Sequence, residues 1–178
     1  MSEIISNVVT DAIFARRSIR SYNEIQLSDE ELNTILESGI WAPTARNQQE
    51  VDFYVMQNRN TIDLLSEKSS AFAKREKVQD VSYGAPTLIL LFAKKGARFM
   101  EMDAGIAVEN MALAAQSLGL GSVIVGTYKE FMASGEGIEF AKSLGVPEEF
   151  QFCISIAIGH TVNATKAQPR RENRVFYI

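Results

Sequence analysis

The residues best suited to chemistry form a short basic segment near the N-terminus, Arg16-Arg17-Ser18-Ile19-Arg20-Ser21-Tyr22. In an extended chain alternate side chains point the same way, so Arg16, Ser18 and Arg20 share one face. Two guanidiniums with a hydroxyl between them suit a phosphate and a second electron-rich group further along, because guanidinium donates in pairs to oxyanions. A solvated basic turn would use the same residue types, so the rest of the chain must decide.

The overall charge argues against a nucleic-acid surface. The chain has 178 residues, of which 46% are hydrophobic and 22% charged, and its net charge is −4. These values are typical of one soluble globular domain and leave no basic excess to neutralise a polyanion. The arginines gather instead at 16–20 and at 170–174, which marks two local sites on an acidic protein.

The scarcity of histidine and cysteine narrows the possible chemistry. The one cysteine, Cys153, lies in an apolar run and is expected to be a core residue of a protein in a reducing compartment. No signal peptide and no membrane-length apolar run is apparent, so we expect a cytoplasmic protein. His160 alone makes a histidine-built metal site improbable and offers one candidate base. An enzyme of this composition would therefore depend on a bound cofactor.

Hydrophobic periodicity predicts a single α+β domain over residues 1–178, with a mixed central sheet flanked by helices. Helices are expected over 3–15, from Ser28 to before Pro43, over 60–79, over 99–118, and once or twice within 129–144. Strands are expected over 51–57, 87–93, 122–125 and 150–158. The polar stretch 161–178 ends in apolar residues, which predicts an arm docked on a partner subunit.

Three of these elements carry more specific expectations. Ser28 and Glu31 have the spacing of a capping box. The run 87–93 is continuously apolar, which predicts a strand covered on both faces. The helix over 99–118 is apolar around its circumference, so it should be central or buried against a partner. Within that helix Asp103 could be an N-cap, and Asn110 could form a hydrogen bond in the core.

The glycine-rich stretch 119–126 resembles a dinucleotide-binding loop only superficially. A Rossmann fingerprint follows a strand and opens a helix, whereas this stretch follows a helix and opens a strand. Its end is more informative. A glycine at Gly126, followed by Thr127, allows a flat ring to approach exposed backbone N–H groups.

Four segments, in order, resemble the nitroreductase family of flavin enzymes across most of the chain. They are Arg16-x-Ser18-x-Arg20, the loop Ala42-Pro43-Thr44-x-x-Asn47-x-Gln49, Gly84-Ala85-Pro86 before an apolar strand, and Asp103-Ala104-Gly105 leading through Asn110 to Gly119-Leu120-Gly121-Ser122. Each motif is weak alone, and their order makes the combination specific. The resemblance implies a nitroreductase-like fold, an intertwined homodimer, and FMN at the subunit interface.

The resemblance also assigns roles to individual residues. Arg16 and Ser18 would hold the phosphate and ribityl chain, and Arg20 would lie near the pyrimidine edge of the flavin. The second subunit would contribute Pro43, Thr44 and Asn47. The backbone N–H of Gly126 or Thr127 would face flavin N5, and Arg170 with Arg171 would return to the phosphate. Arg17 and Gln49 complete the candidate cofactor-binding set.

The activity implied is ping-pong electron transfer from NADH or NADPH through FMN to a nitroaromatic, a quinone or a similar small acceptor. No protein side chain would then be a catalytic acid or base. Two alternatives stay open: specialised flavin chemistry such as dehalogenation or flavin fragmentation, and a non-catalytic flavin- or nucleotide-binding module.

The chain departs from the family pattern at three places. Glu50 and Val51 replace a proline and an aromatic residue, and Gln168 replaces a lysine near the tail arginines. Only residues 94–98 separate the apolar strand from the long helix, where lidded relatives carry inserted helices. The pocket above the flavin should therefore be open, which leaves the acceptor undefined.

Overall fold

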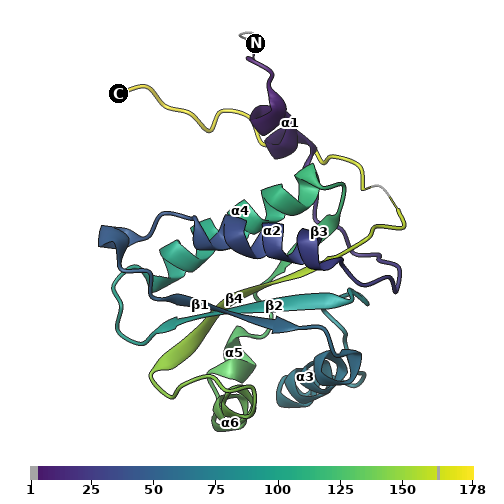
Figure 1. Cartoon of the computed structure of the whole chain (residues 1–178), viewed down its shortest axis with the longest axis vertical. Helices are drawn as coiled ribbons and strands as arrows, with labels where there is room; N and C mark the ends of the chain where they lie inside the picture. The colour runs from purple at the N-terminus through teal and green to yellow at the C-terminus, as the bar shows by residue number, and fades with distance from the viewer. Residues whose placement is uncertain (1–3, 164) are drawn as a thin grey trace.

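A layer of β-strands runs through the middle of the protein, with helices on both sides (Figure 1). The computed structural model describes residues 4–163 and 165–178. Within them the sheet has the spatial order β1-β2-β4-β3. The strands are β1 (Val51–Met56), β2 (Thr87–Lys94), β3 (Gly121–Val125) and β4 (Phe150–Gly159). The predicted strands are thus confirmed to within one residue at each end.

The sheet is antiparallel, which corrects the expectation of a mixed sheet. All three ladders, β1 with β2, β2 with β4 and β3 with β4, are antiparallel. β2 and β3 do run in the same direction, but β4 lies between them, so this parallel pair never exchanges hydrogen bonds. Parallel pairing within the described residues is limited to a single bridge between Ser18 and Ser122.

The helices divide between the two faces of the sheet (Figure 1). One face carries α2 (Asp29–Ile40) and α4 (Met100–Ser117), and the other carries α3 (Arg59–Phe72), α5 (Lys129–Met132) and α6 (Gly135–Ser143). Helix α1 (Val8–Ala15) lies beyond α2 and α4 at the end of the molecule from which the C-terminal arm also projects.

Two predicted helices are shorter than expected, for local reasons. α1 begins at Val8 because the Asn7 side chain accepts hydrogen bonds from Val9 N and Thr10 N and so caps the helix. Residue 3, the first of that prediction, lies outside the described part. α3 ends at Phe72, seven residues early, because Lys74 adopts a left-handed φ of 51° that no helix continues through. The predicted capping box of α2 is confirmed, since Ser28 Oγ accepts from Glu31 N and Glu31 Oε2 from Ser28 N.

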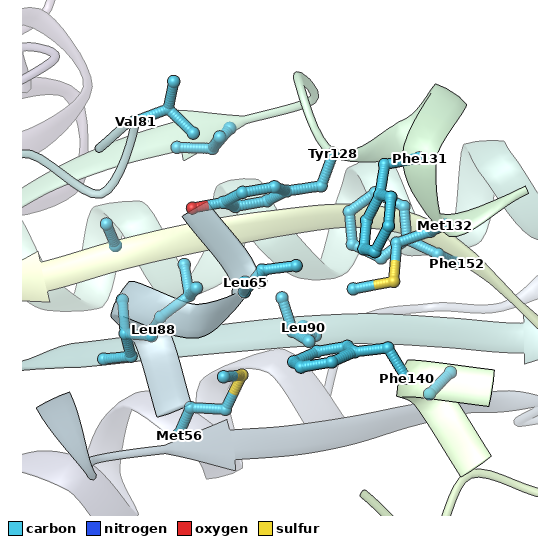
Figure 2. Close-up of a cluster of buried hydrophobic side chains, with 14 of the residues drawn as sticks. Met56, Leu65, Val81, Leu88, Leu90, Tyr128, Phe131, Met132, Phe140 and Phe152 are labelled. Atoms are coloured by element: carbon cyan, nitrogen blue, oxygen red, sulfur yellow. The ribbon is translucent and has the colours of Figure 1, made fainter. Parts of the chain in front are cut away.

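Two apolar cores lie on opposite sides of β2, as its sequence predicted. Leu88, Leu90 and Phe92 pack toward α3, α5 and α6, whereas Ile89, Leu91 and Ala93 pack toward α2 and α4. Figure 2 shows the first core, whose further large members include Leu65, Tyr128, Phe131, Met132 and Phe140. The second contains Cys153, and burial raises the pKa of its thiol to about 11. Cys153 is therefore the core residue that the sequence indicated.

Helix α4 connects the layers. Its small side chains Ala104, Ala107, Ala112 and Ala115 are buried, so α4 packs closely on the sheet and on α2. Asn110 Nδ2 donates to the Ser38 carbonyl at 3.1 Å and ties α4 to α2, which confirms the predicted core hydrogen bond. The side of α4 that bears Met102 and Ile106 remains exposed.

Large apolar side chains are exposed on α1 and at the tip of the arm. On α1 they include Val8, Val9, Ile13 and Phe14, and at the tip they are Val175, Phe176, Tyr177 and Ile178. Trp41, at the end of α2, is also exposed. Exposed large apolar side chains in such numbers are typical of interaction surfaces. None of the described helices combines the length and hydropathy needed to cross a bilayer.

Candidate cofactor site

The basic segment runs along the free edge of β3. Ser18 bridges Ser122, and Ile19 N donates to the Ser122 carbonyl at 2.8 Å. The Ile19 side chain is buried over Gly121, where an added Cβ would lie 2.9 Å from Ile19 Cγ2. The segment is therefore paired with the sheet at Ser18, as the extended alternative considered from the sequence requires, and Ile19 fastens it there.

The three arginines of this segment have different surroundings. Arg16 Nε lies 3.3 Å from Glu109 Oε1, with the Arg16 side chain 23% exposed. Arg17 donates through Nη1 to the carbonyl of Phe14 at 2.6 Å and to the carbonyl of Arg16 at 2.7 Å, so its guanidinium caps the end of α1. Arg20 lies over the Tyr83 ring with its guanidinium carbon 5.6 Å from the centroid. Arg17 is therefore the arginine of this segment whose guanidinium stabilises the end of a helix.

Strand β3 sets the spacing between the basic segment and Gly126. Ser122 and Gly126 are four residues apart, which corresponds to about 13 Å along a strand. Gly126 and Thr127 follow directly after β3. A Cβ added to Gly126 would meet only Ile154 Cδ1, at 3.5 Å, so the outer side of this glycine is open. A ligand with an anionic end and a flat end could thus contact both positions.

A cavity of about 340 Å³ lies beside Gly126 and Thr127. Its lining includes Phe72 and Arg75 from the end of α3 and the loop that follows. Arg75 falls within the range 60–79 over which the sequence predicts a helix, so its place beside Gly126 is not apparent from the sequence. The left-handed Lys74 next to it, which brings the loop toward Gly126, has no clear signature in the sequence.

The polar loop 42–49 is held to the start of α4. Ala45 N donates to both carboxylate oxygens of Asp103, at 3.1 and 3.2 Å. Because α4 begins at Met100, Asp103 lies in its first turn and is not the N-cap that the sequence suggested. Its role is to anchor the loop, a contact over 58 residues of sequence.

Within this loop the candidate residues are ordered by one another. Thr44 Oγ1 accepts from Gln49 N at 3.0 Å, and Gln49 Nε2 donates to Asn47 Oδ1 at 2.8 Å. Arg46, Asn47 and Gln49 have left-handed φ values of 54°, 55° and 53°. Asparagine tolerates this conformation, but for the other two it is a strain of the kind that accumulates at ligand-binding loops.

One chain does not bring this loop to Ser18. Asp103 lies in the first turn of α4, whereas Ser122, the partner of Ser18, lies just past its end. The 14 residue steps from Asp103 to Ser117 span about 21 Å of helix. Pro43, Thr44, Asn47 and Gln49 are therefore near one end of α4, and Ser18 is near the other.

The C-terminal arm starts beside the basic segment. Thr161 bridges Tyr22, and Val162 N donates to the Ser21 carbonyl at 3.3 Å. Arg170 and Arg171 lie further along the arm and are exposed. Arg170 is eight residue steps from Val162, which gives an extended reach of about 27 Å. The arm is thus long enough to return to Arg16, although in this chain it extends outward (Figure 1).

The turn that carries Tyr83 is organised around Asp80. Its carboxylate accepts from Arg59 Nη2 at 2.6 Å, from Gly84 N at 2.9 Å and from Ser82 N at 2.8 Å. Burial by itself raises the pKa of Asp80, but the hydrogen bonds from Ser82, Gly84 and Arg59 outweigh it and hold this pKa below its ordinary value.

Replacing Asp80 with asparagine should lower the free energy of unfolding at pH 7 by about 1.5–3 kcal/mol, the usual range for hydrogen bonds to a charged group. A depressed folded-state pKa stabilises the fold above the unfolded pKa of about 3.9 and loses that effect as the pH falls through the folded value. The gap between wild type and Asp80→Asn should therefore narrow in acid, as measured by urea denaturation at pH 7 and pH 3.5. Asp63→Asn, which also removes a carboxylate bound to Arg59 but leaves the turn intact, is the control. An equal gap at both pH values would contradict this account.

Known proteins resemble this chain over most of its length. The model of the nitroreductase family matches residues 13–160. A protein of Archaeoglobus fulgidus, provisionally named NADH dehydrogenase/NAD(P)H nitroreductase, is 33% identical over 153 residues, covering 83% of this chain and 82% of its own length. The NADPH-flavin oxidoreductase of Vibrio harveyi is 26% identical over 175 residues, covering 92% of this chain and 70% of its own length.

Solved structures show the same architecture. The crystal structure of a nitroreductase with bound FMN from Bacteroides fragilis NCTC 9343 has a TM-score of 0.90 and 28% identity, and covers 97% of this chain and 100% of that chain. The helix-covered antiparallel sheet of this chain is thus an architecture that it shares with a nitroreductase crystallised with FMN. The chain belongs to the nitroreductase family, which confirms the resemblance seen in the sequence.

Proposed function

We propose that this protein is an FMN-dependent oxidoreductase that passes electrons from NADH or NADPH to a small acceptor. The observation that carries the proposal is the Arg16–Arg20 segment, fixed along β3 with Gly126 at the far end of the same strand. This arrangement supplies cationic donors at one end and an open backbone at the other. Relatives of this family are NAD(P)H-linked by name, and a solved relative contains FMN.

The residues present suit FMN in their chemistry. Arg16 and Ser18 would bind the phosphate, and Arg170 and Arg171 would add charge to the same group. Gly126 and Thr127 would offer backbone N–H groups to the ring. Bound FMN supplies the redox chemistry, and the protein supplies position and charge. A positive charge from Arg20 near the pyrimidine edge favours electron-rich forms of the ring and thereby raises its potential.

We further propose that two copies form the complete site. In one chain Thr44 and Asn47 lie near the opposite end of α4 from Ser18, so a second copy is needed to bring both groups to one ligand. The exposed apolar residues of α1 and of the arm tip provide the surface that such a pair would bury. The arm is the natural contact to the partner, because its apolar tip follows a polar stretch.

The acceptor is proposed to be a small aromatic such as a nitroaromatic or a quinone. β2 ends at Lys94 and α4 begins at Met100, so five residues join them and no inserted helix covers the site from this connection. An open site of this kind lets the nicotinamide leave before the acceptor enters. Because the two substrates would occupy the same position one after the other, we expect ping-pong kinetics with little acceptor selectivity.

An anaerobic titration of the purified protein tests the proposal. The protein should be yellow, or become so with FMN, and should bleach when NADH or NADPH is added. Reoxidation by a panel of nitroaromatics and quinones then identifies the acceptor class, and parallel double-reciprocal plots identify the ping-pong order. A protein that is colourless after incubation with FMN and removal of the unbound FMN would falsify the function. A protein that binds FMN but is not bleached by either nicotinamide would be a non-catalytic flavin module.

Replacing Gly126 with alanine should separate cofactor binding from folding. The new Cβ would meet only Ile154, at an ordinary contact distance of 3.5 Å, and the φ of Gly126 is not left-handed. The free energy of unfolding should change by less than about 0.5 kcal/mol. The methyl group would occupy the space proposed for the ring, so the dissociation constant of FMN should rise by roughly tenfold or more, as expected for an overpacked contact. Fluorescence titration and urea denaturation measure the two quantities.

Gly121→Ala is the matched control for this prediction. There the added Cβ would lie 2.9–3.1 Å from three atoms of the Ile19 side chain, so stability should fall together with FMN affinity. Unchanged FMN affinity in Gly126→Ala would contradict the placement of the ring at Gly126.

A further inference from the structure

The Tyr83 turn explains what keeps the guanidinium of Arg20 in place. Among the described residues Arg20 has no carboxylate partner, and its one recorded hydrogen bond, to the Ser18 carbonyl, is long at 3.4 Å. Its guanidinium instead lies over the Tyr83 ring, 5.6 Å from the centroid. That distance is within the range in which an aromatic face attracts a cation.

Tyr83 reaches this position through an unusual backbone. Its φ is 57°, and that of Gly84 is 76°, so two successive residues are left-handed. For a bulky residue such as tyrosine this conformation is uncommon and must be imposed by its surroundings. The imposing contacts are those of Asp80, which accepts from Ser82 N and Gly84 N on either side of Tyr83, while Arg59 holds the same carboxylate.

The other side of Arg20 is also fixed. Tyr22 Oη donates to the Ile19 carbonyl at 2.7 Å, which braces the backbone on both sides of Arg20. Tyr22 and Tyr83 both pack against the core between β2 and α3. The backbone of Arg20 is therefore attached to the sheet, and its charged end rests on a ring that belongs to a separate, strained turn.

We propose that Tyr83 is a positioning residue that holds the Arg20 guanidinium against the flavin ring, so that the Asp80-anchored turn sets the redox potential of the bound cofactor. This inference rests on the proposed function, and in particular on the placement of Arg20 at the pyrimidine edge. Tyr83 itself needs no contact with the cofactor. Its ring acts through Arg20, which would otherwise sample many rotamers in solvent and exert a weaker average field.

The experiment compares Tyr83→Leu with Tyr83→Phe in the full-length, FMN-loaded protein. Phenylalanine keeps the ring face, so its potential should equal that of wild type. Leucine removes the ring, so the equilibrium constant for two-electron reduction of bound FMN should fall about three- to tenfold, in line with a cation–π contact of ordinary strength. A tenfold fall corresponds to about 30 mV toward more negative potential for a two-electron couple. Dye equilibration under xanthine oxidase measures the potential.

A double-mutant cycle with Arg20→Gln shows whether Tyr83 acts through Arg20. In the Arg20→Gln background Tyr83→Leu should cause no further shift of potential. An equal shift in both backgrounds would overturn the inference, because Tyr83 would then act on the flavin without Arg20. A lower melting temperature of Tyr83→Leu with an unchanged potential would also overturn it, since that result indicates only a structural role.

A measurement without cofactor separates this inference from the proposed function. In the apoprotein the Arg20 Hε resonance should be shifted by the ring current of Tyr83, and the shift should persist in Tyr83→Phe and vanish in Tyr83→Leu. If wild-type protein bound no FMN but showed this shift, the proposed function and its redox consequence would fail while the Arg20–Tyr83 pairing stood. If FMN bound and the shift were absent, the pairing would be overturned and the function retained.

Discussion

Arg16→Ala is expected to raise the dissociation constant of FMN by about 10- to 100-fold, because a charge-assisted hydrogen bond to a phosphate is worth about 1.5–3 kcal/mol. The fold should tolerate this change. Arg16 pairs with Glu109, whose side chain is 44% exposed, so water can solvate the carboxylate that is left behind. Quenching of FMN fluorescence at constant ionic strength gives the dissociation constant, and urea denaturation gives the stability.

Two further variants show whether the loss is specific to Arg16. Lys142→Ala removes one positive charge that pairs with Glu139 on α6, and it should leave FMN affinity unchanged. Arg17→Ala removes the cap on α1 and should affect stability more than affinity. Unchanged FMN binding in Arg16→Ala would refute the phosphate site, and an equal loss in Lys142→Ala would mean that only net charge matters.

If the proposed dimer forms through the arm tip, replacing both Phe176 and Tyr177 with serine is expected to convert it to monomers and to remove most bound FMN. Each large side chain contributes about 1.5–3 kcal/mol when it passes from water into an apolar contact, so two together weaken the association at least about a hundredfold. A monomer could not present loop 42–49 of a second copy to Arg16–Arg20, so FMN should be lost with the dimer. Sedimentation velocity and the flavin-to-protein absorbance ratio report the two effects.

The control for this prediction keeps the apolar tip and removes the charges. Arg170→Ala with Arg171→Ala should remain dimeric and should bind FMN more weakly, because only the proposed phosphate contact is lost. A serine variant that stays dimeric with full FMN would show that the arm tip is not the dimer contact.

Local signals in the sequence were sufficient for most of the fold. The capping box at Ser28 and Glu31 depends on neighbours three residues apart, and the apolar run of β2 reflects burial on both faces. The end of α3 was not predictable in the same way. Residues 73–79 are polar enough for an exposed helix, and the contacts that end it, such as Gln79 N to Ser70 Oγ, depend on the folded loop.

The candidate site was predictable to the extent that it lies within short segments. The extended basic segment and the glycine after β3 follow from residue type and order, and the structure joins them along one strand. The position of Asp103 near a helix start suggests only a cap, because its actual contact, with Ala45 N, crosses 58 residues of sequence. The sequence indicates a turn at Tyr83 but no role for its ring, because the position of that ring depends on a turn shaped by Asp80 and Arg59. The contributions of Arg170 and Arg171 remain predictions.

Helix α4 touches both halves of the proposed site in each chain. Asp103 in its first turn holds loop 42–49, and Glu109, six residues on, pairs with Arg16. In a dimer in which each loop 42–49 contributes to the partner's site, one α4 helix would support the FMN site of its own chain through Glu109 and that of the partner through Asp103. A change that displaces α4 in a single chain would then weaken FMN binding at both sites of such a dimer, so the two sites would not be independent.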